Sequence, residues 1–164
     1  MADAKFIHPP NKLRKAKVGT GRAKLDLKAL QKAEKIVEKI QEEYSDWADE
    51  DLAAFEDVLG TLKSDDEEEQ RAALKALYTL SLDMKGQGGS FGFRMMSEIA
   101  ARLNDFVAPR DALSKLDVDV VEAHISALHA IYRENVRDDG GKMGTALLIG
   151  LDKIVAKANA RSQK

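Results

Sequence analysis

Apolar residues recur with the period of an α-helix along most of this chain, and this pattern is the strongest constraint on its fold. The recurrence begins at Leu27 and continues past Leu151, with charged residues between the apolar positions. Only three prolines occur in the 164 residues, and two of them, Pro9 and Pro10, precede the first helical segment. Runs of β-branched residues, which would indicate strands, are few. The sequence therefore predicts an all-α protein.

The helical pattern divides into segments that we expect to be separate helices. Apolar stripes occupy residues 27–44, 52–62, 74–84, 94–106, 118–132 and 147–155. Short connections between these segments favour an antiparallel up-and-down four-helix bundle with additional flanking helices.

Local signals predict where these helices begin and end. The stretch SDWADEDL, residues 45–52, predicts a break between the first two stripes. We expect Ser64 to cap the next helix, with Glu67 completing a capping box. Pro109 ends the helix before it, and the run Asp-Asp-Gly-Gly at residues 138–141 predicts a turn.

Charge and composition separate an N-terminal arm from one folded domain. Residues 1–24 carry seven basic residues against one acid, which predicts a flexible basic arm, and residues 25–164 form the helical domain. The net charge of −2 gives no reason to expect nucleic-acid binding, and we interpret the arm as a solvated tail. With no cysteine, no secretory signal and no long apolar run, we expect a cytoplasmic protein that does not bind membranes.

The segment 81–96, SLDMKGQGGSFGFRMM, is unusual because it places four glycines inside a helical pattern: Gly86, Gly88, Gly89 and Gly92. Known glycine-rich nucleotide motifs do not fit, since no strand precedes the segment and no Lys-Ser or Lys-Thr pair ends it. On a helix, Leu82, Gly86, Gly89 and Phe93 share one side, away from the apolar stripe. We therefore expect Leu82 at the surface, beside a platform that the glycines leave bare.

Two interpretations of these glycines remain open. In the first, the platform lets a bulky partner approach the backbone, and Lys85 holds the negative charge of that partner. In the second, Gly88 and Gly92 allow two helices to cross closely or mark a bend. Different glycines can serve each role.

The same residues resemble the motif of histidine-containing phosphotransfer (Hpt) domains, the four-helix modules of bacterial phosphorelays. That motif reads H-x-x-K-G-x-x-x-x-x-G, and Lys85, Gly86 and Gly92 match its lysine and its two glycines. The run KGQGGSFG is also similar to a longer bacterial subgroup of Hpt proteins. The resemblance covers most of residues 45–160, and it implies a helical bundle that binds the receiver domain of a response regulator.

The chain departs from the Hpt motif at the position of the phosphoacceptor. Leu82 stands where the family carries its histidine, and leucine offers no nucleophile. We expect His124 and His129 to be ordinary surface or half-buried residues, because neither has a Lys-Gly platform beside it. Without cysteine or a His-x-x-x-His spacing, the sequence predicts neither a metal site nor another cofactor.

The resemblance thus implies a degenerate Hpt protein that binds a receiver domain or a histidine kinase without accepting phosphate. Its expected partner-binding residues are Leu82, Lys85, Gly86, Gly89 and Phe93. We therefore expect that the protein does not catalyse phosphotransfer through the usual acceptor position, which Leu82 occupies. Three alternatives remain: an active phosphotransfer protein with a relocated histidine, a purely structural or oligomerising bundle, and nucleic-acid binding through the basic arm.

Overall fold

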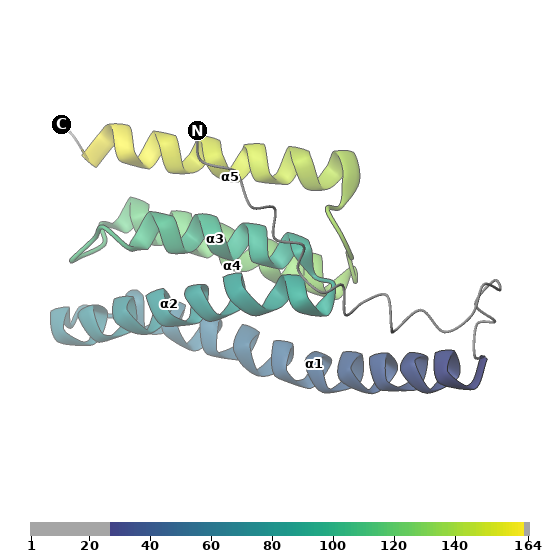
Figure 1. Cartoon of the computed structure of the whole chain (residues 1–164). Coiled ribbons are helices and arrows are strands. Elements are labelled where there is room, and N and C mark those ends of the chain that lie inside the picture. Colours follow the sequence, from purple (N-terminus) through teal and green to yellow (C-terminus); the bar gives the residue numbers. More distant parts are fainter. Residues whose placement is uncertain (1–26, 163–164) are drawn as a thin grey trace, which may run out of the picture. The chain divides into compact units, whose positions relative to one another are not determined.

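The computed structural model describes residues 27–162, and every regular element in that range is a helix (Figure 1). The elements follow in the order α1 (Leu27–Leu62), α2 (Glu67–Gln87), the short 3₁₀ helix η2 (Gly88–Phe91), α3 (Arg94–Val107), α4 (Lys115–Arg133) and α5 (Gly141–Ser162). The all-α prediction is confirmed. Among the helices described, none combines the length and the apolar character needed to cross a membrane.

The chain divides into two compact units, the first ending at Ile36 and the second beginning at Val37. The arm expected at residues 1–24, and its boundary with the domain, lie outside the described residues. The first ten described residues, 27–36, belong to the first unit, and the core and sites described below belong to the second.

α1 is one continuous helix, so the predicted break at residues 45–52 is wrong. The sequence from Leu27 to Leu59 contains neither proline nor glycine. Ser and Asp each cost less than about 0.7 kcal/mol in a helix, against about 3 kcal/mol for proline. Beyond the expected break, the apolar stripe is buried at Ala48, Leu52, Phe55, Leu59 and Leu62. Burial of this stripe outweighs the weak helix propensity of the polar residues before it.

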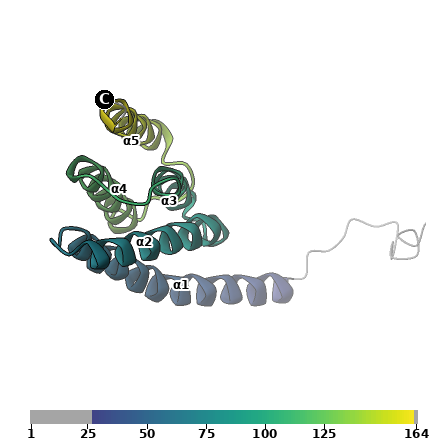
Figure 2. The ribbon, with the colours of Figure 1, turned by 90° about the vertical axis from the view of Figure 1, so that its left-hand side faces the viewer.

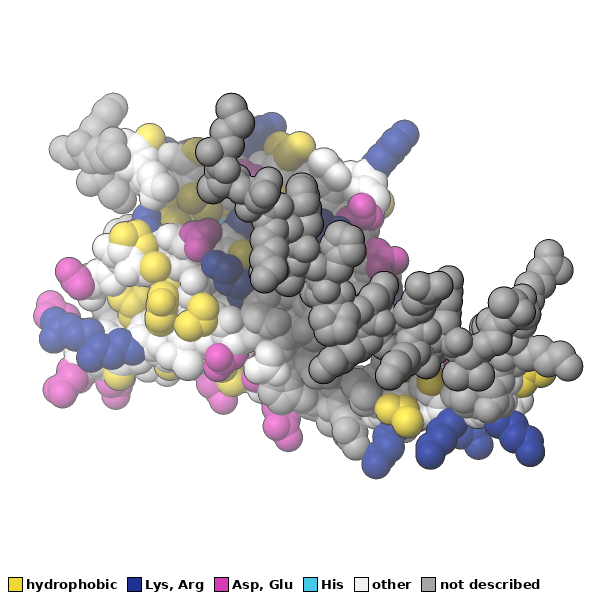
Figure 3. Space-filling model, in the orientation of Figure 1, with side chains coloured by type: hydrophobic (Ala, Val, Ile, Leu, Met, Phe, Trp, Pro, Cys, Tyr) yellow, Lys and Arg dark blue, Asp and Glu magenta, His cyan; other side chains and the backbone are white. Residues whose placement is uncertain are grey.

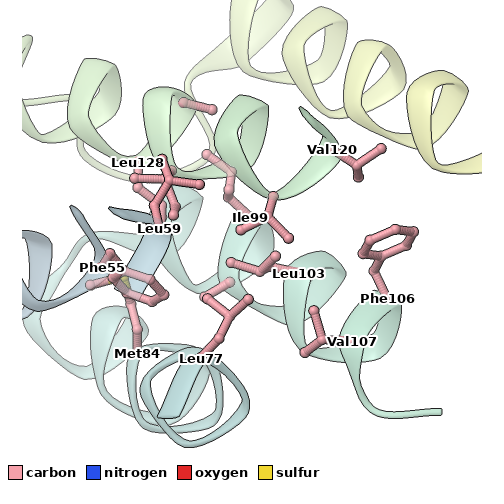
Figure 4. Packing of buried hydrophobic residues seen from close by; sticks show 14 of the residues in the cluster. Phe55, Leu59, Leu77, Met84, Ile99, Leu103, Phe106, Val107, Val120 and Leu128 are labelled. Carbon is pink, nitrogen blue, oxygen red and sulfur yellow. The ribbon is translucent and has the colours of Figure 1, made fainter. Parts of the chain in front are cut away.

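The core of the second unit combines one face of each helix. Figure 4 shows Phe55 and Leu59 of α1, Leu77 and Met84 of α2, and residues of α3 and α4 converging on a common interior. α5 contributes the buried residues Leu151 and Ala158 and contacts both α3 and α4 (Figure 2). The inner face predicted for α2 is confirmed at Leu74, Leu77, Ser81 and Met84.

A small polar network lies inside this apolar interior, between α2 and α3. The amide of Asn104 donates to Ser81 Oγ at 3.1 Å and to the carbonyl oxygen of Tyr78 at 3.2 Å. Ser81 Oγ donates to the same carbonyl at 2.9 Å. Because these hydrogen bonds join α2 to α3, they favour one rotation of α2 against α3.

The cap predicted for α2 is wrong by two residues. Asp66, and not Ser64, is the N-cap, and its carboxylate accepts hydrogen bonds from the backbone N–H groups of Glu68 at 2.8 Å and Glu69 at 3.1 Å. Ser64 instead donates its hydroxyl to the Glu69 carboxylate at 2.8 Å, outside the helix start. In an acidic run preceded by serine, several side chains satisfy the capping pattern, and the backbone geometry selects one of them.

The cap assignment leads to a stability prediction. Asp66→Ala should lower the free energy of unfolding by about 1 kcal/mol, because two backbone donors lose their acceptor. Ser64→Ala, the matched control in the same loop, should cost less, because Ser64 Oγ accepts only the backbone N–H of Asp66, at 3.2 Å, and no N–H of the first helical turn. Urea unfolding followed by circular dichroism checks both variants. A larger loss for Ser64→Ala than for Asp66→Ala would contradict this assignment.

Candidate functional site

The candidate site is an exposed strip of α2, called here the Leu82 face, formed by Tyr78, Leu82, Lys85 and Gly86. Leu82 is 45% exposed and Tyr78, one turn earlier, is 41% exposed. Figure 3 shows a cluster of hydrophobic side chains towards the end of the molecule where α2 begins and α3 ends, with charged side chains beside it. Since Ser81 and Met84 fix the inner face of α2, the helical period turns Leu82 outward. The predicted surface position of Leu82 is confirmed.

Gly86 and Lys85 form the part of the face that follows Leu82. A Cβ placed on Gly86 would meet no heavy atom within 4 Å, so the backbone is open to approach there. Lys85 Nζ lies 3.3 Å from the carboxylate of Asp105 on α3. Exposed pairs of this kind contribute only about 0–1 kcal/mol, so an anionic partner can compete with Asp105 for the lysine.

Two of the remaining glycines serve folding. A Cβ on Gly88 would lie 2.9 Å from Ser97 Oγ and 3.2 Å from the carbonyl oxygen of Phe93. Gly92 has φ of +83°, in the left-handed region that side chains rarely adopt. Gly88 and Gly92 therefore support the second interpretation of the glycines, and Gly86 is compatible with the first.

Gly89 and Phe93 do not extend the Leu82 face as expected. α2 ends at Gln87, and the chain continues as η2, in which the backbone N–H of Gly89 donates to Ser97 Oγ at 2.7 Å. Phe93 is only 3% exposed, and its ring lies 5.9 Å from that of Tyr132 and beneath the guanidinium of Arg137. The prediction of Phe93 at the docking surface is wrong, because the left-handed turn at Gly92 redirects the chain into the core.

Neither described histidine adjoins the Leu82 face, since both belong to α4. His124 is fully buried, and its Nδ1 lies 2.8 Å from the carbonyl oxygen of Val120. Burial is the main cause that lowers the pKa of His124. His129 Nε2 lies 2.9 Å from the Glu56 carboxylate of α1. The expected half-buried position fits His129 and is wrong for His124, which no partner can reach in the folded protein.

An acidic group that the sequence analysis missed lies near the Leu82 face. Asp51 of α1 has one carboxylate oxygen that is buried and has no hydrogen-bond partner. Burial raises the pKa of Asp51 from 3.8 to about 6, and the nearby charges of Asp83 and Glu50 act in the same direction. Asp83 directly follows Leu82 in the sequence. Asp51 and Asp83 therefore place acidic side chains beside the Leu82 face. No sequence pattern signals this pairing, because it depends on the packing of α1 against α2.

The described residues contain no cluster of three or more His, Cys, Asp or Glu side chains placed to hold a metal ion. Comparisons with models of known protein families, with curated proteins and with solved structures found no match for this chain. The side chains of the Leu82 face offer apolar contact through Tyr78 and Leu82 and ion pairing through Lys85.

The two glycine roles lead to opposite stability predictions. Gly86→Ala should raise the free energy of unfolding by about 0.5–1 kcal/mol, because alanine favours the helix and meets open space. Gly88→Ala should lower it by about 1–3 kcal/mol, since the added methyl crowds Ser97 and the Phe93 carbonyl. Thermal and urea unfolding of the two variants check this pair. Equal changes in the free energy of unfolding for Gly86→Ala and Gly88→Ala would contradict the assignment of different roles to the two glycines.

Asp51 leads to a pH-dependent prediction. The folded protein holds this proton more tightly than the unfolded chain, so ionisation of Asp51 lowers stability as pH rises from about 4 to about 6. Asp51→Asn should therefore stabilise the protein by about 1 kcal/mol at pH 7.5, a value reduced for solvent screening, and by little at pH 4. Urea unfolding at both pH values measures the difference. Asp57→Asn, an exposed position on the same helix, is the control and should change stability little at either pH.

Proposed function

We propose that this chain is a degenerate Hpt-like protein that binds a receiver domain or a histidine kinase through the Leu82 face, without accepting phosphate there. The observation that carries this proposal is the exposed Leu82 at the phosphoacceptor position, with Lys85 and Gly86 at motif spacing beside it. In this proposal, the C-terminal part of α1 together with α2, α3 and α4 corresponds to the four-helix bundle of Hpt domains, and α5 is an additional flanking helix.

The geometry of the Leu82 face suits binding without chemistry. Leu82 and Tyr78 present apolar surface one helical turn apart, and exposed apolar side chains of this kind act as anchors when a partner covers them. Gly86 allows the partner close to the backbone, and Lys85 is held only by an exposed ion pair. Such a protein would occupy a receiver and withhold it from active phosphotransfer proteins.

A second candidate function is oligomerisation, which a separate observation favours. Leu27, Leu30 and Ile36 of the first unit are 68%, 42% and 51% exposed. Apolar residues exposed along a helix commonly pair with another chain. Sedimentation velocity of the wild type and of Leu27→Glu/Leu30→Glu tests this alternative, which requires a dimer that the double variant dissociates.

Receiver binding is tested with Leu82→Glu. Receiver domains encoded in the source genome are screened against the full-length protein by isothermal titration calorimetry, and at least one should bind. Leu82→Glu should weaken that complex about 10-fold or more, because a carboxylate would be desolvated at the centre of the contact. Ile149→Glu, a 48% exposed apolar position on α5, is the matched control and should leave binding unchanged. Absence of any receiver complex, or equal effects of the two variants, would refute receiver binding at the Leu82 face.

The substitution Leu82→His tests the same site by restoring the imidazole that the Hpt motif carries at this position. When incubated with its phosphorylated receiver, Leu82→His should acquire acid-labile phosphate, whereas the wild type should acquire none. Label on the wild type would instead support the relocated-histidine alternative, and mapping of the labelled residue would identify the acceptor.

A further inference from the structure

A hollow of about 610 Å³ lies between α2 and the C-terminal end of α3, and we call it the α2–α3 hollow. Leu74 and Val107, both buried, contribute apolar surface to it, and Tyr78 and Thr79 line its α2 side. The hollow touches the Leu82 face at Tyr78 but is a separate feature. Its volume lies within the range of about 300–1,000 Å³ that is typical of ligand pockets.

Positive charge surrounds this apolar hollow. Arg71 and Lys75, one turn apart on α2, line it, and within the described chain neither side chain has an ion-pair or hydrogen-bond partner. Arg110 is the third cation, but its guanidinium donates to the Phe106 carbonyl and to Asn159 and stacks 3.7 Å above the Phe106 ring. The lining contains one acid, Asp111.

A second hollow of about 570 Å³, between α3 and α5, provides a contrast. Its Arg102 lies 3.0 Å from the Glu98 carboxylate and 2.9 Å from the Asp152 carboxylate, so its charge is neutralised within the chain. Of these two hollows, the α2–α3 hollow is therefore the one that presents uncompensated positive charge to a partner.

The combination of apolar floor and unpaired cations restricts the occupant. A small inorganic anion would cover none of the apolar surface and would remain hydrated beside two exposed side chains. An uncharged apolar group would cover the floor but leave the cations without acceptors. An apolar side chain flanked by carboxylates satisfies both parts, and a protein segment can supply that combination.

We propose that the α2–α3 hollow is a docking site for an acidic segment of a partner protein. The segment inserts an aromatic or leucine side chain against Leu74 and Val107, and its carboxylates pair with Arg71 and Lys75. This proposal is independent of receiver binding at the Leu82 face.

Three synthetic helical peptides of equal length serve as probes in a titration of the ¹⁵N-labelled full-length protein followed by NMR. The acidic peptide carries phenylalanine with glutamates four residues before and after it. The basic peptide has lysines in place of those glutamates, and the third peptide has serine in place of phenylalanine. The acidic peptide should shift the amide signals of Thr79, Val107 and Ala108 in a saturable way. Binding of the other two should be at least about 10-fold weaker, because the basic peptide lacks the carboxylates and the serine peptide lacks the apolar side chain.

Matched charge reversals locate the site. Arg71→Glu/Lys75→Glu should weaken the acidic peptide about 10-fold or more at low salt, and the effect should shrink as salt increases. Lys153→Glu/Lys157→Glu, two exposed lysines with the same spacing on α5, should change the affinity less than about 2-fold. Leu82→Ala should also leave the affinity within about 2-fold, which separates this site from the receiver proposal.

Three results would overturn the inference. The first is equal binding of the acidic and basic peptides, and the second is undiminished binding to Arg71→Glu/Lys75→Glu. The third is the absence of saturable shifts at the α2–α3 hollow with millimolar acidic peptide. Each of them can occur while a receiver still binds the Leu82 face, so the two proposals fail separately.

Discussion

The buried contact of Asn104 with Ser81 and the Tyr78 carbonyl joins α2 to α3 on the inner face of α2, opposite the face that reaches the solvent. Apolar side chains alone pack in several rotations, whereas a satisfied polar pair in a dry interior has one good geometry. Here that geometry places Asn104 of α3 against Ser81 of α2 at 3.1 Å. This contact and the apolar inner face of α2 act in the same direction, and with α2 in this rotation Leu82 is exposed, the space beside Gly86 is open and Tyr78 lines a hollow.

The helices of this protein could be predicted from the sequence because their signal is local. The helical period identified the inner face of α2 and the exposure of Leu82, since both depend on residues within two turns. The predicted break in α1 was wrong because burial of Phe55 and Leu59 outweighs the propensity of a few polar residues before them. The cap at Ser64 was wrong because neighbouring side chains competed for the same donors.

The site could be predicted only in part, because several of its features depend on contacts between residues that are far apart in the sequence. The prediction that Phe93 lies at the surface assumed that the helix continues through the glycines. The positive φ of Gly92 ends that helical path, and residue spacing alone does not reveal a positive φ. The raised pKa of Asp51 requires α1 to lie against Asp83. The α2–α3 hollow likewise joins residues more than thirty positions apart in the sequence, Arg71 and Val107 among them. Such features appear only when the helices are packed together.

The crowding around Gly88 and the left-handed backbone of Gly92 show that glycines of this motif can be retained for folding and not for binding. Both residues stabilise the turn from α2 into α3, so selection for a stable fold alone would favour keeping them, whether or not the protein binds a partner. Gly86 has no such structural obligation, since a methyl group there meets empty space. Under the proposed function, substitution of Gly86 would therefore be the earliest sequence change expected in a lineage whose Leu82 face no longer binds a partner.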